Sequence, residues 1–135
     1  LDESHRRRSI YFMIKRSRLI PIMQVFDQPE PLVSQGSRPS TTIAPQALLF
    51  MNNPQVVKWA HGLAQNLDAS QPDEAIRQLY LRTLTREPTL AELTNSRAFF
   101  DSQSTSYSKE KNAAQLALAD LCQVMLSLNE FIYLP

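Results

Sequence analysis

The chain has 135 residues, of which 43% are hydrophobic and 20% charged, and this composition is ordinary for one soluble globular domain, so wholesale disorder is excluded. Its two glycines, Gly36 and Gly62, lie in no GxGxxG or Walker-type pattern, which excludes a glycine-rich phosphate cradle. No segment reaches the roughly 18 consecutive apolar residues that spanning a bilayer requires.

The charge is unevenly distributed along the chain. Residues 1–20 carry six bases and two acids, whereas residues 21–135 carry eight bases and eleven acids, which gives +4, −3 and an overall +1. A basic arm of this kind is suited to nucleic acid or an anionic surface. Because six bases are few and the isoelectric point is only about 8.1, we expect no nucleic-acid role. Pairing with acids elsewhere in the parent protein fits the arm better.

The N-terminal third is predicted to be mostly irregular. Residues 9–14 form a short apolar run that fits either a strand or a buried helix. Residues 19–26 fit a helix of about two turns with Pro21 at its start. Residues 27–40 are polar and rich in proline, so we expect irregular structure. A loop of this length is usually functional or docked against a partner.

The chain turns helical after residue 40. Pro45 suits a first helical position, where its missing N–H costs nothing, and residues 46–51 continue the helix. Asn53 repeats the signal, because Asn is a strong N-cap and proline is allowed at the next position. We therefore predict a short helix, a break at residues 52–53 and a longer helix over residues 54–67.

One face of that longer helix is predicted to be core. Its apolar residues recur at spacings of three and four, as on the buried stripe of an amphipathic helix. They are Val56, Trp59, Ala60, Leu63, Ala64 and Leu67. Trp59 is the only tryptophan, and its indole N–H needs a partner if it is buried.

Two further helices follow a polar connector at residues 68–72. The first covers residues 73–84, with two acids favourably placed near its positive N-terminal end. Its apolar face is Ile76, Leu79, Tyr80 and Leu84. The second opens with Thr89 and Glu92, a T-x-x-E capping box, and runs to about Phe100. It is predicted to bury Leu90, Leu93 and one or both of Phe99 and Phe100.

The last predicted helix follows a polar linker at residues 101–108. It begins at Lys109 or Asn112 and ends near Asn129, and residues 131–133 form a docked tail. Its apolar face is Ala114, Leu118, Leu121, Cys122, Met125 and Leu128. The fold class is therefore mainly α, a bundle of about five helices after an irregular, proline-rich N-terminal third. The length fits one domain, so we expect residues 1–135 to be a single domain. Because the chain lacks an initiator Met, we infer that it is the C-terminal fragment of a longer multidomain protein, although maturation or omitted residues would give the same start.

Residues able to carry chemistry are sparse. His5 and His61 are the only histidines, and both fit solvated or structural roles better than catalysis. His61 and Asp68 are a possible pair, although a metal site would need further ligands. Cys122 is the only cysteine, so an intrachain disulfide is impossible, and it fits a buried hydrophobe better than a reactive thiol. We expect no catalytic group, cofactor or metal in this chain.

Four stretches carry a family resemblance: RRRSIYFMIKRS, PIMQVFDQPEP, SRPSTTIAPQALLFMNNPQVV and DLCQVMLSLNEFIYL. Their order and spacing resemble the C-terminal domain of unknown function of planctomycete surface proteins, which often occurs in chains with cytochrome-c-like modules. The resemblance implies a periplasmic or cell-surface location and haem, if any, in upstream modules. Its activity is unassigned, so it implies no catalytic residue. That family often has a Cys before the residue that matches Arg38, and the SQGS found here argues against a thiol-dependent role.

The resemblance also singles out a set of polar positions. The candidates are Lys15, Arg16, Asp27, Arg38, Thr42, Gln46, Asn52 and Asn53. In one interpretation Asp27 caps a turn or pairs with Arg16 or Arg38. Gln46 and the two asparagines then bond nearby irregular backbone, which makes the region a stapled loop. In the other interpretation the same residues line a ligand-binding pocket.

A second similarity concerns LYLRTLTREPTLAEL and VMLSLNEF. These segments resemble helical repeat-like modules of exported bacterial proteins with a GRxPxxxEL…FLxSxEF pattern, which implies only helix, turn and helix.

Two functional hypotheses follow. The first is a non-catalytic helical domain for protein–protein interaction, which docks onto upstream modules of an exported, cytochrome-c-associated protein or onto other surface proteins. The alternative is that the chain completes the active site of a larger extracytoplasmic enzyme, acting on polysaccharide or in haem-linked redox chemistry. In that case Lys15, Arg16, Asp27 or Arg38 would contribute.

Overall fold

The computed structural model of the chain describes residues 9–11, 15, 20–29, 34, 36–37 and 44–133, and none of these lies in a β-strand. The elements are η1 (Ser9–Tyr11), α1 (Pro21–Val25), α2 (Ala44–Asn52), α3 (Pro54–Ala64), α4 (Pro72–Leu84), α5 (Leu90–Ser106), α6 (Ala113–Leu126) and α7 (Asn129–Ile132). The predicted mainly α fold with about five helices is confirmed, because α2 to α6 each have nine residues or more. None of the described helices is long and apolar enough to span a membrane.

The chain divides into two compact units, Leu1–Gln46 and Ala47–Pro135. The single domain over residues 1–135 therefore stays a prediction. In the first unit, α1 begins with Pro21 at its first position, as the sequence predicts, and is five residues long. The start of the ambiguous apolar run is a 3-10 turn, Ser9–Tyr11, and residues 12–14 lie outside the described part. The described residues between 27 and 40 are irregular, as predicted.

The break between α2 and α3 is a single residue, Asn53. Its extended backbone ends α2, and its side-chain oxygen accepts a hydrogen bond from the Gln55 N–H at 2.8 Å, which caps α3. The predicted break at Asn52 is wrong, because that residue is still helical and its side chain donates to the Leu48 carbonyl at 3.0 Å. α3 also ends three residues earlier than predicted, although Leu67 is buried.

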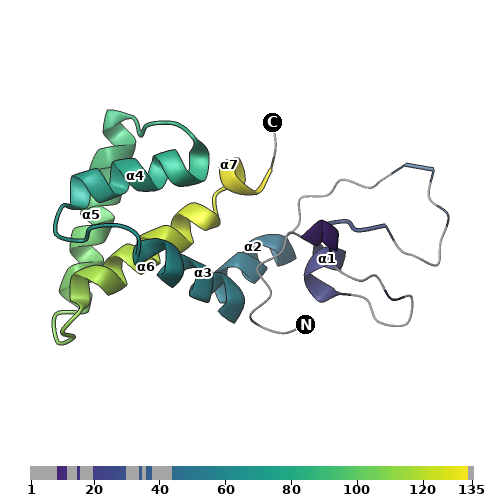
Figure 1. Ribbon diagram of the computed structural model, residues 1–135, viewed down its shortest axis with the longest axis horizontal. Helices are drawn as coiled ribbons and strands as arrows, with labels where there is room; N and C mark the ends of the chain where they lie inside the picture. The colour runs from purple at the N-terminus through teal and green to yellow at the C-terminus, as the bar shows by residue number, and fades with distance from the viewer. Residues whose placement is uncertain are drawn as a thin grey trace. The chain divides into compact units, whose positions relative to one another are not determined.

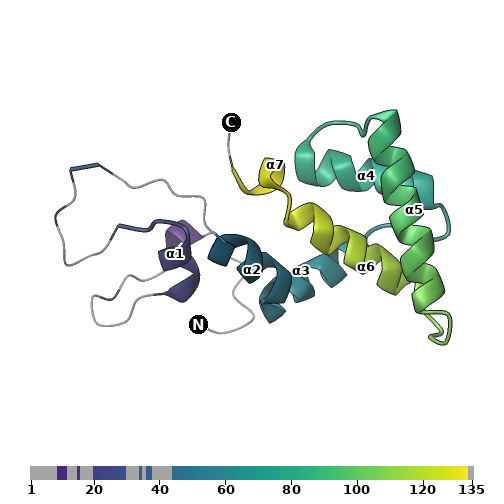
Figure 2. The same ribbon diagram turned by 180° about the vertical axis from the view of Figure 1, so that it is seen from behind.

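The second unit is built around α6. This helix contacts α3, α4, α5 and α7, and Figures 1 and 2 show it running between α3 and α5. Its buried residues are Ala117, Leu118, Ala119, Leu121, Cys122, Met125 and Leu126. The predicted apolar face of this helix is confirmed, with Ala114 and Leu128 partly buried at its ends. Removal of this surface from water supplies the main driving force for folding of the unit.

Two residues that the sequence predicts to be core are exposed instead. Trp59 is 51% exposed and Leu90 is 82% exposed. On α3 the buried stripe of Val56, Ala60 and Ala64 is centred on Ala60, and Trp59 lies about 100° round the helix from that centre at 100° per residue. Leu90 is the first residue of α5, before that helix reaches its neighbours. The buried faces of α3 and α5 are therefore smaller than the spacing of their apolar residues indicates.

The linker predicted at residues 101–108 is also wrong, because α5 continues to Ser106. Hydroxyl groups in this stretch bond back to carbonyls one turn earlier, Thr105 to Asp101 at 2.9 Å and Ser106 to Ser102 at 3.1 Å. Arg97 also pairs with Asp101 at 3.1 Å along the same helix. The tail predicted at residues 131–133 belongs largely to a short helix, α7, which contacts α4 and α6, so its helical form is what the sequence did not predict.

Candidate functional site

Three of the eight predicted site residues have amide side chains that form hydrogen bonds with the protein backbone. Gln46 is 2% exposed, and its side chain donates to the Val25 carbonyl at 2.9 Å, which joins α2 to the end of α1 within the first unit. Asn52 bonds a helical carbonyl, and Asn53 caps α3. These contacts are of the kind that the stapled-loop interpretation expects.

The other five candidates are less well defined. Lys15 is exposed, and Arg16, Arg38 and Thr42 lie outside the described residues, as do their predicted pairings. Asp27 follows the C-cap of α1 and has a backbone φ of 56°, in the left-handed region that Asp tolerates better than most residues. The predicted ligand pocket and the predicted ion pairs of Asp27 therefore stay predictions.

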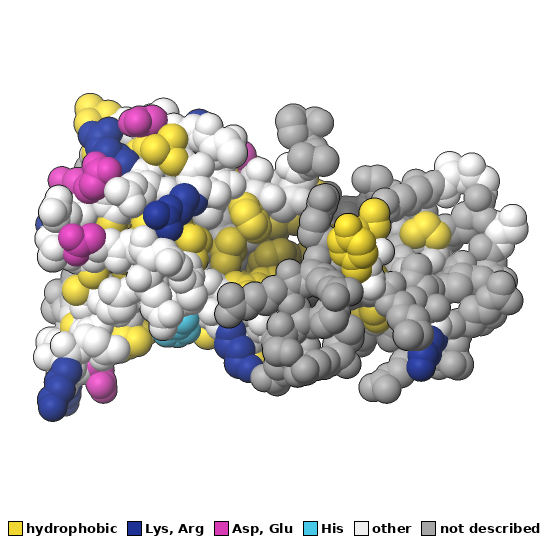
Figure 3. All heavy atoms as spheres, viewed as in Figure 1, with side chains coloured by type: hydrophobic (Ala, Val, Ile, Leu, Met, Phe, Trp, Pro, Cys, Tyr) yellow, Lys and Arg dark blue, Asp and Glu magenta, His cyan; other side chains and the backbone are white. Residues whose placement is uncertain are grey.

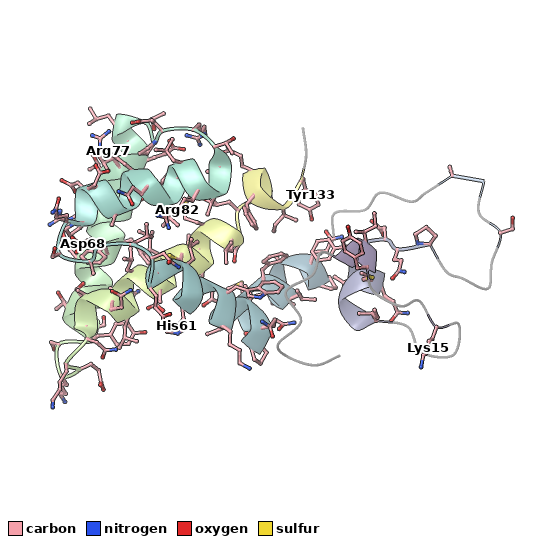
Figure 4. The ribbon with its side chains drawn as sticks, viewed as in Figure 1. Lys15, His61, Asp68, Arg77, Arg82 and Tyr133 are labelled. Atoms are coloured by element: carbon pink, nitrogen blue, oxygen red, sulfur yellow. The ribbon has the colours of Figure 1, made fainter. Side chains whose placement is uncertain are left out.

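The histidine pair predicted from spacing is replaced by a different contact. Asp68 accepts two hydrogen bonds from Ser70, at 2.9 Å from its N–H and 2.7 Å from its hydroxyl, and these hold the pKa of Asp68 below its ordinary value. His61 is exposed on α3, and Figure 4 shows it apart from Asp68, which lies in the connector before α4. Among the described residues, no three His, Cys, Asp or Glu side chains gather as metal ligands would.

The lone thiol is a core side chain. Cys122 has no exposed surface, and burial raises its pKa to about 12. A thiol is nucleophilic as the thiolate, so this environment makes Cys122 inert. The interpretation of Cys122 as a small buried hydrophobe is confirmed.

The most extensive polar contact in the second unit is centred on Arg86. Its guanidinium donates to both carboxylate oxygens of Glu92 at 2.9 and 2.7 Å, and to both of Glu130 at 2.7 and 2.9 Å. A fifth bond goes to the Glu87 carbonyl at 3.1 Å. We call Arg86, Glu92 and Glu130 the Arg86 cluster. All five N–H donors of the guanidinium are used in these bonds.

Local structure places each member of the Arg86 cluster. α4 ends at Leu84, and its C-cap residue Thr85 has a left-handed φ of 57°. Arg86 is therefore the first residue after this turn. Thr89 and Glu92 form the predicted capping box of α5, in which the Glu92 carboxylate accepts the Thr89 N–H at 2.7 Å. Glu130 lies in the first turn of α7. The cluster therefore joins the end of α4, the start of α5 and α7.

The electrostatics of the cluster favour its charged form. Hydrogen bonds from Arg86, followed by those from Thr89, lower the pKa of Glu92 to about 2. The pKa of Glu130 is also lowered, mainly by Arg86, and the pKa of Arg86 is raised by both carboxylates. The guanidinium carbon also lies 5.6 Å from the centre of the Tyr80 ring. With every donor used, Arg86 acts as a clamp between helices, and it has no N–H left to bind a substrate anion.

Sequence reasoning did not identify this cluster as a site. Both parts of the second resemblance contain its members, Arg86 and Glu92 in TREPTLAEL and Glu130 in LNEF. Their pairing needed the tertiary fold, because Arg86 and Glu130 are 44 positions apart.

An exposed apolar surface lies on α2 and α3. Leu48 is 54% exposed and Met51 is 62% exposed, one turn apart on α2, and Trp59 is 51% exposed on α3. We call these three residues the α2–α3 surface. Large exposed apolar side chains are typical of interaction sites, and Trp is enriched among the residues that dominate binding.

The fold and these contacts define a class, a helical domain in which most of the described polar side chains of the candidate sites form hydrogen bonds within the chain. The family model of PSD1, described as a protein of unknown function (DUF1553), matches residues 1–100. The chain therefore belongs to this family of unknown function. Neither a curated protein nor a solved structure matches the chain.

Proposed function

We propose that this chain is a non-catalytic helical interaction domain that docks onto modules preceding it in its parent protein. The observation that carries this proposal is the α2–α3 surface, where three large apolar side chains are each at least half exposed. Keeping such side chains in water is unfavourable, and covering them on docking is favourable by roughly 25 cal/mol per Å² of apolar area. Other surface proteins are a further possible partner of the same kind.

The described polar groups support a structural role. Gln46 and Asn53 bond backbone groups, and Arg86 is saturated by two carboxylates and a carbonyl. Side chains of these types bind substrates or anions in catalytic and anion-binding sites. Because they are engaged within the chain, docking through apolar contacts fits the chain better than chemistry does.

The location and context of the domain are part of the proposal. The resemblance to planctomycete surface proteins supports an exported protein in the periplasm or at the cell surface, with cytochrome-c-like modules in the same chain. The CxxCH motif of c-type haem attachment does not occur in this sequence, so haem would belong to the upstream modules.

Calorimetry tests the docking proposal. The 135-residue chain is titrated with the separately produced polypeptide that precedes residue 1 in the parent protein. Trp59→Ala is expected to weaken binding roughly 30-fold, as loss of a central interface Trp commonly does. Leu90→Ala is the matched control, since Leu90 is exposed away from the α2–α3 surface and its loss should leave affinity unchanged. Absence of wild-type binding, or equal affinity of all three proteins with unchanged circular dichroism, would overturn the proposal.

One observation favours the alternative, in which the chain completes the active site of a larger enzyme. Asp27 has left-handed backbone geometry, which is found at active sites as well as in ordinary turns. We rank this second because turn chemistry explains the same φ. Its test is turnover of the full-length parent with Asp27→Ala and, separately, Arg38→Ala. Unchanged turnover in correctly folded variants would rule it out.

A further inference from the structure

The two carboxylates of the Arg86 cluster are held unequally. Glu92 is bonded by Arg86 and also by the N–H and the hydroxyl of Thr89, at 2.7 and 2.9 Å. In the part of the chain that the structure describes, the carboxylate of Glu130 is bonded by Arg86 alone. The Glu130 side chain is also the more exposed of the two, 49% against 33%. The bond between Arg86 and Glu130 is therefore the side of the cluster that opens more easily.

The helix that carries Glu130 has little else to hold it. α7 has four residues, Asn129–Ile132, and a helix of this length is not stable by itself. None of its residues is buried, no side chain caps its first turn, and Phe131 is 40% exposed. It follows directly on α6, as Figure 1 shows, and contacts α4 and α6. Loss of the bonds to Arg86 would release α7 before the rest of the unit unfolds.

Arg86 keeps its position after such a release. Both Nη1 donors and one Nη2 donor bond the Glu87 carbonyl and the Glu92 carboxylate, and these bonds do not involve α7. The guanidinium also remains over the Tyr80 ring, 5.6 Å from its centre. The donors set free are Nε–H and the second Nη2–H, which bond the two oxygens of Glu130 while α7 is in place. They form a fixed, two-pronged site for another carboxylate.

The charge around the cluster does not attract anions in general. Residues 68–135 carry nine acids and six bases. Figure 3 shows acidic and basic side chains together over α4 and α5. A ligand is therefore selected by the two donors of Arg86 themselves, whose geometry matches the two oxygens of a planar carboxylate.

We infer that α7 is a releasable latch and that Arg86, once Glu130 leaves, binds a glutamate or aspartate side chain of a partner protein. The occupant that the chain itself provides is a side-chain carboxylate on a short segment, so a partner segment of the same kind fits the same place. While α7 is closed every donor of Arg86 is occupied, and a partner binds only the open fraction of the molecules. This inference goes beyond docking through the α2–α3 surface and does not depend on it.

Hydrogen exchange of the whole 135-residue chain tests the latch. The N–H groups of residues 131–133 bond carbonyls of residues 128–129 while α7 is formed. Glu130→Ala is expected to speed their exchange about tenfold and to leave the amides of α6 unchanged. Glu87→Ala is the matched control, because it removes an equal charge from an exposed pair with Arg77 and leaves α7 bonded. Unchanged exchange in Glu130→Ala, or an equal increase in α6, would overturn the latch.

Two capped peptides test the carboxylate site. One has the sequence of residues 128–133, LNEFIY, and the other has Gln in place of its Glu. Binding is followed by NMR at the Nε–H of Arg86. The glutamate peptide is expected to bind the Glu130→Ala chain roughly tenfold more tightly than the glutamine peptide does. It should bind the wild type roughly tenfold more weakly than the variant, because Glu130 fills the site there.

Three outcomes of the titration would overturn the carboxylate site. They are equal affinity of the two peptides, equal affinity of the wild type and Glu130→Ala for the glutamate peptide, and no binding of either peptide. Each of these results leaves the docking function unaffected, since that function is judged by binding of the upstream polypeptide to Trp59→Ala.

Discussion

Arg86 donates to both carboxylate oxygens of Glu130, at 2.7 and 2.9 Å, although the two residues are 44 positions apart in the chain. The same guanidinium holds Glu92, which also caps the start of α5. One side chain therefore fastens α7 and the α4–α5 turn together. Planar, two-pronged contacts to two carboxylates are geometry that arginine provides and lysine does not.

Replacing Arg86 with Lys is expected to lower the thermal midpoint of unfolding. A lysine keeps the positive charge and loses the fork that bonds both carboxylates, so Glu92 and Glu130 are left with fewer donors. Arg77→Lys is the matched control, since Arg77 makes one exposed pair with Glu87 at 3.2 Å. Circular dichroism melts should show a clearly larger loss for Arg86→Lys. Equal midpoints for the two variants would show that the cluster does not stabilise the fold.

The cluster also predicts acid sensitivity. The pKa of Glu92 falls from an ordinary 4.5 to about 2 in the folded chain, so the folded state binds its proton less readily than the unfolded state. Its contribution to stability is complete above pH 4.5 and is lost as the pH falls toward 2. Glu130, whose pKa is also lowered, acts in the same direction.

Urea unfolding at pH 7, 4 and 2.5 measures this dependence in the wild type and in Glu92→Gln. The variant should be less stable at pH 7 and should lose less stability on acidification, so that the two curves converge. A constant difference between wild type and variant at all three pH values would contradict the assignment.

Asn53→Ala is expected to destabilise the chain by about 1 kcal/mol, because the N-cap bond to the Gln55 N–H is lost. Asn52→Ala is the neighbouring control. Its side chain bonds a carbonyl that is already part of the helix, and its position is exposed. Urea titrations that rank Asn52→Ala at or above Asn53→Ala would contradict the capping role.

Cys122 should be almost unreactive in the folded chain. Because burial raises its pKa from 9.0 to about 12, the thiolate fraction at pH 8 falls by roughly a thousandfold before steric protection is counted. Labelling with a thiol reagent should therefore be slow in buffer and fast in 8 M urea, roughly the range that unfolds small domains. Comparable labelling rates in the two conditions would show that Cys122 is accessible.

Local signals predicted the elements whose causes are local. The capping box at Thr89 and Glu92, the cap at Asn53 and the apolar face of α6 depend on spacings of a few residues, and all three were right. The polar stretch after residue 100 was misjudged, because hydroxyl side chains can bond helix carbonyls as well as leave the helix. Composition alone does not distinguish the two.

The rest depends on contacts between distant elements. Periodicity placed Trp59 and Leu90 on apolar faces, but how wide a face is buried depends on which helices pack against it. The Arg86 cluster was hidden for the same reason, since its acids belong to two helices and its base to a turn. Among the predicted site residues, Gln46 and Asn53 bond backbone groups, and the roles of the others stay predictions.

The fluorescence of Trp59, the only tryptophan of the chain, tests the central claim of docking through the α2–α3 surface most directly. In the isolated chain its emission should be that of a water-exposed indole and should be quenched efficiently by acrylamide. Addition of the polypeptide that precedes residue 1 should shift the emission to shorter wavelength and protect it from quenching. An emission spectrum and quenching constant that stay unchanged in the complex would contradict the account.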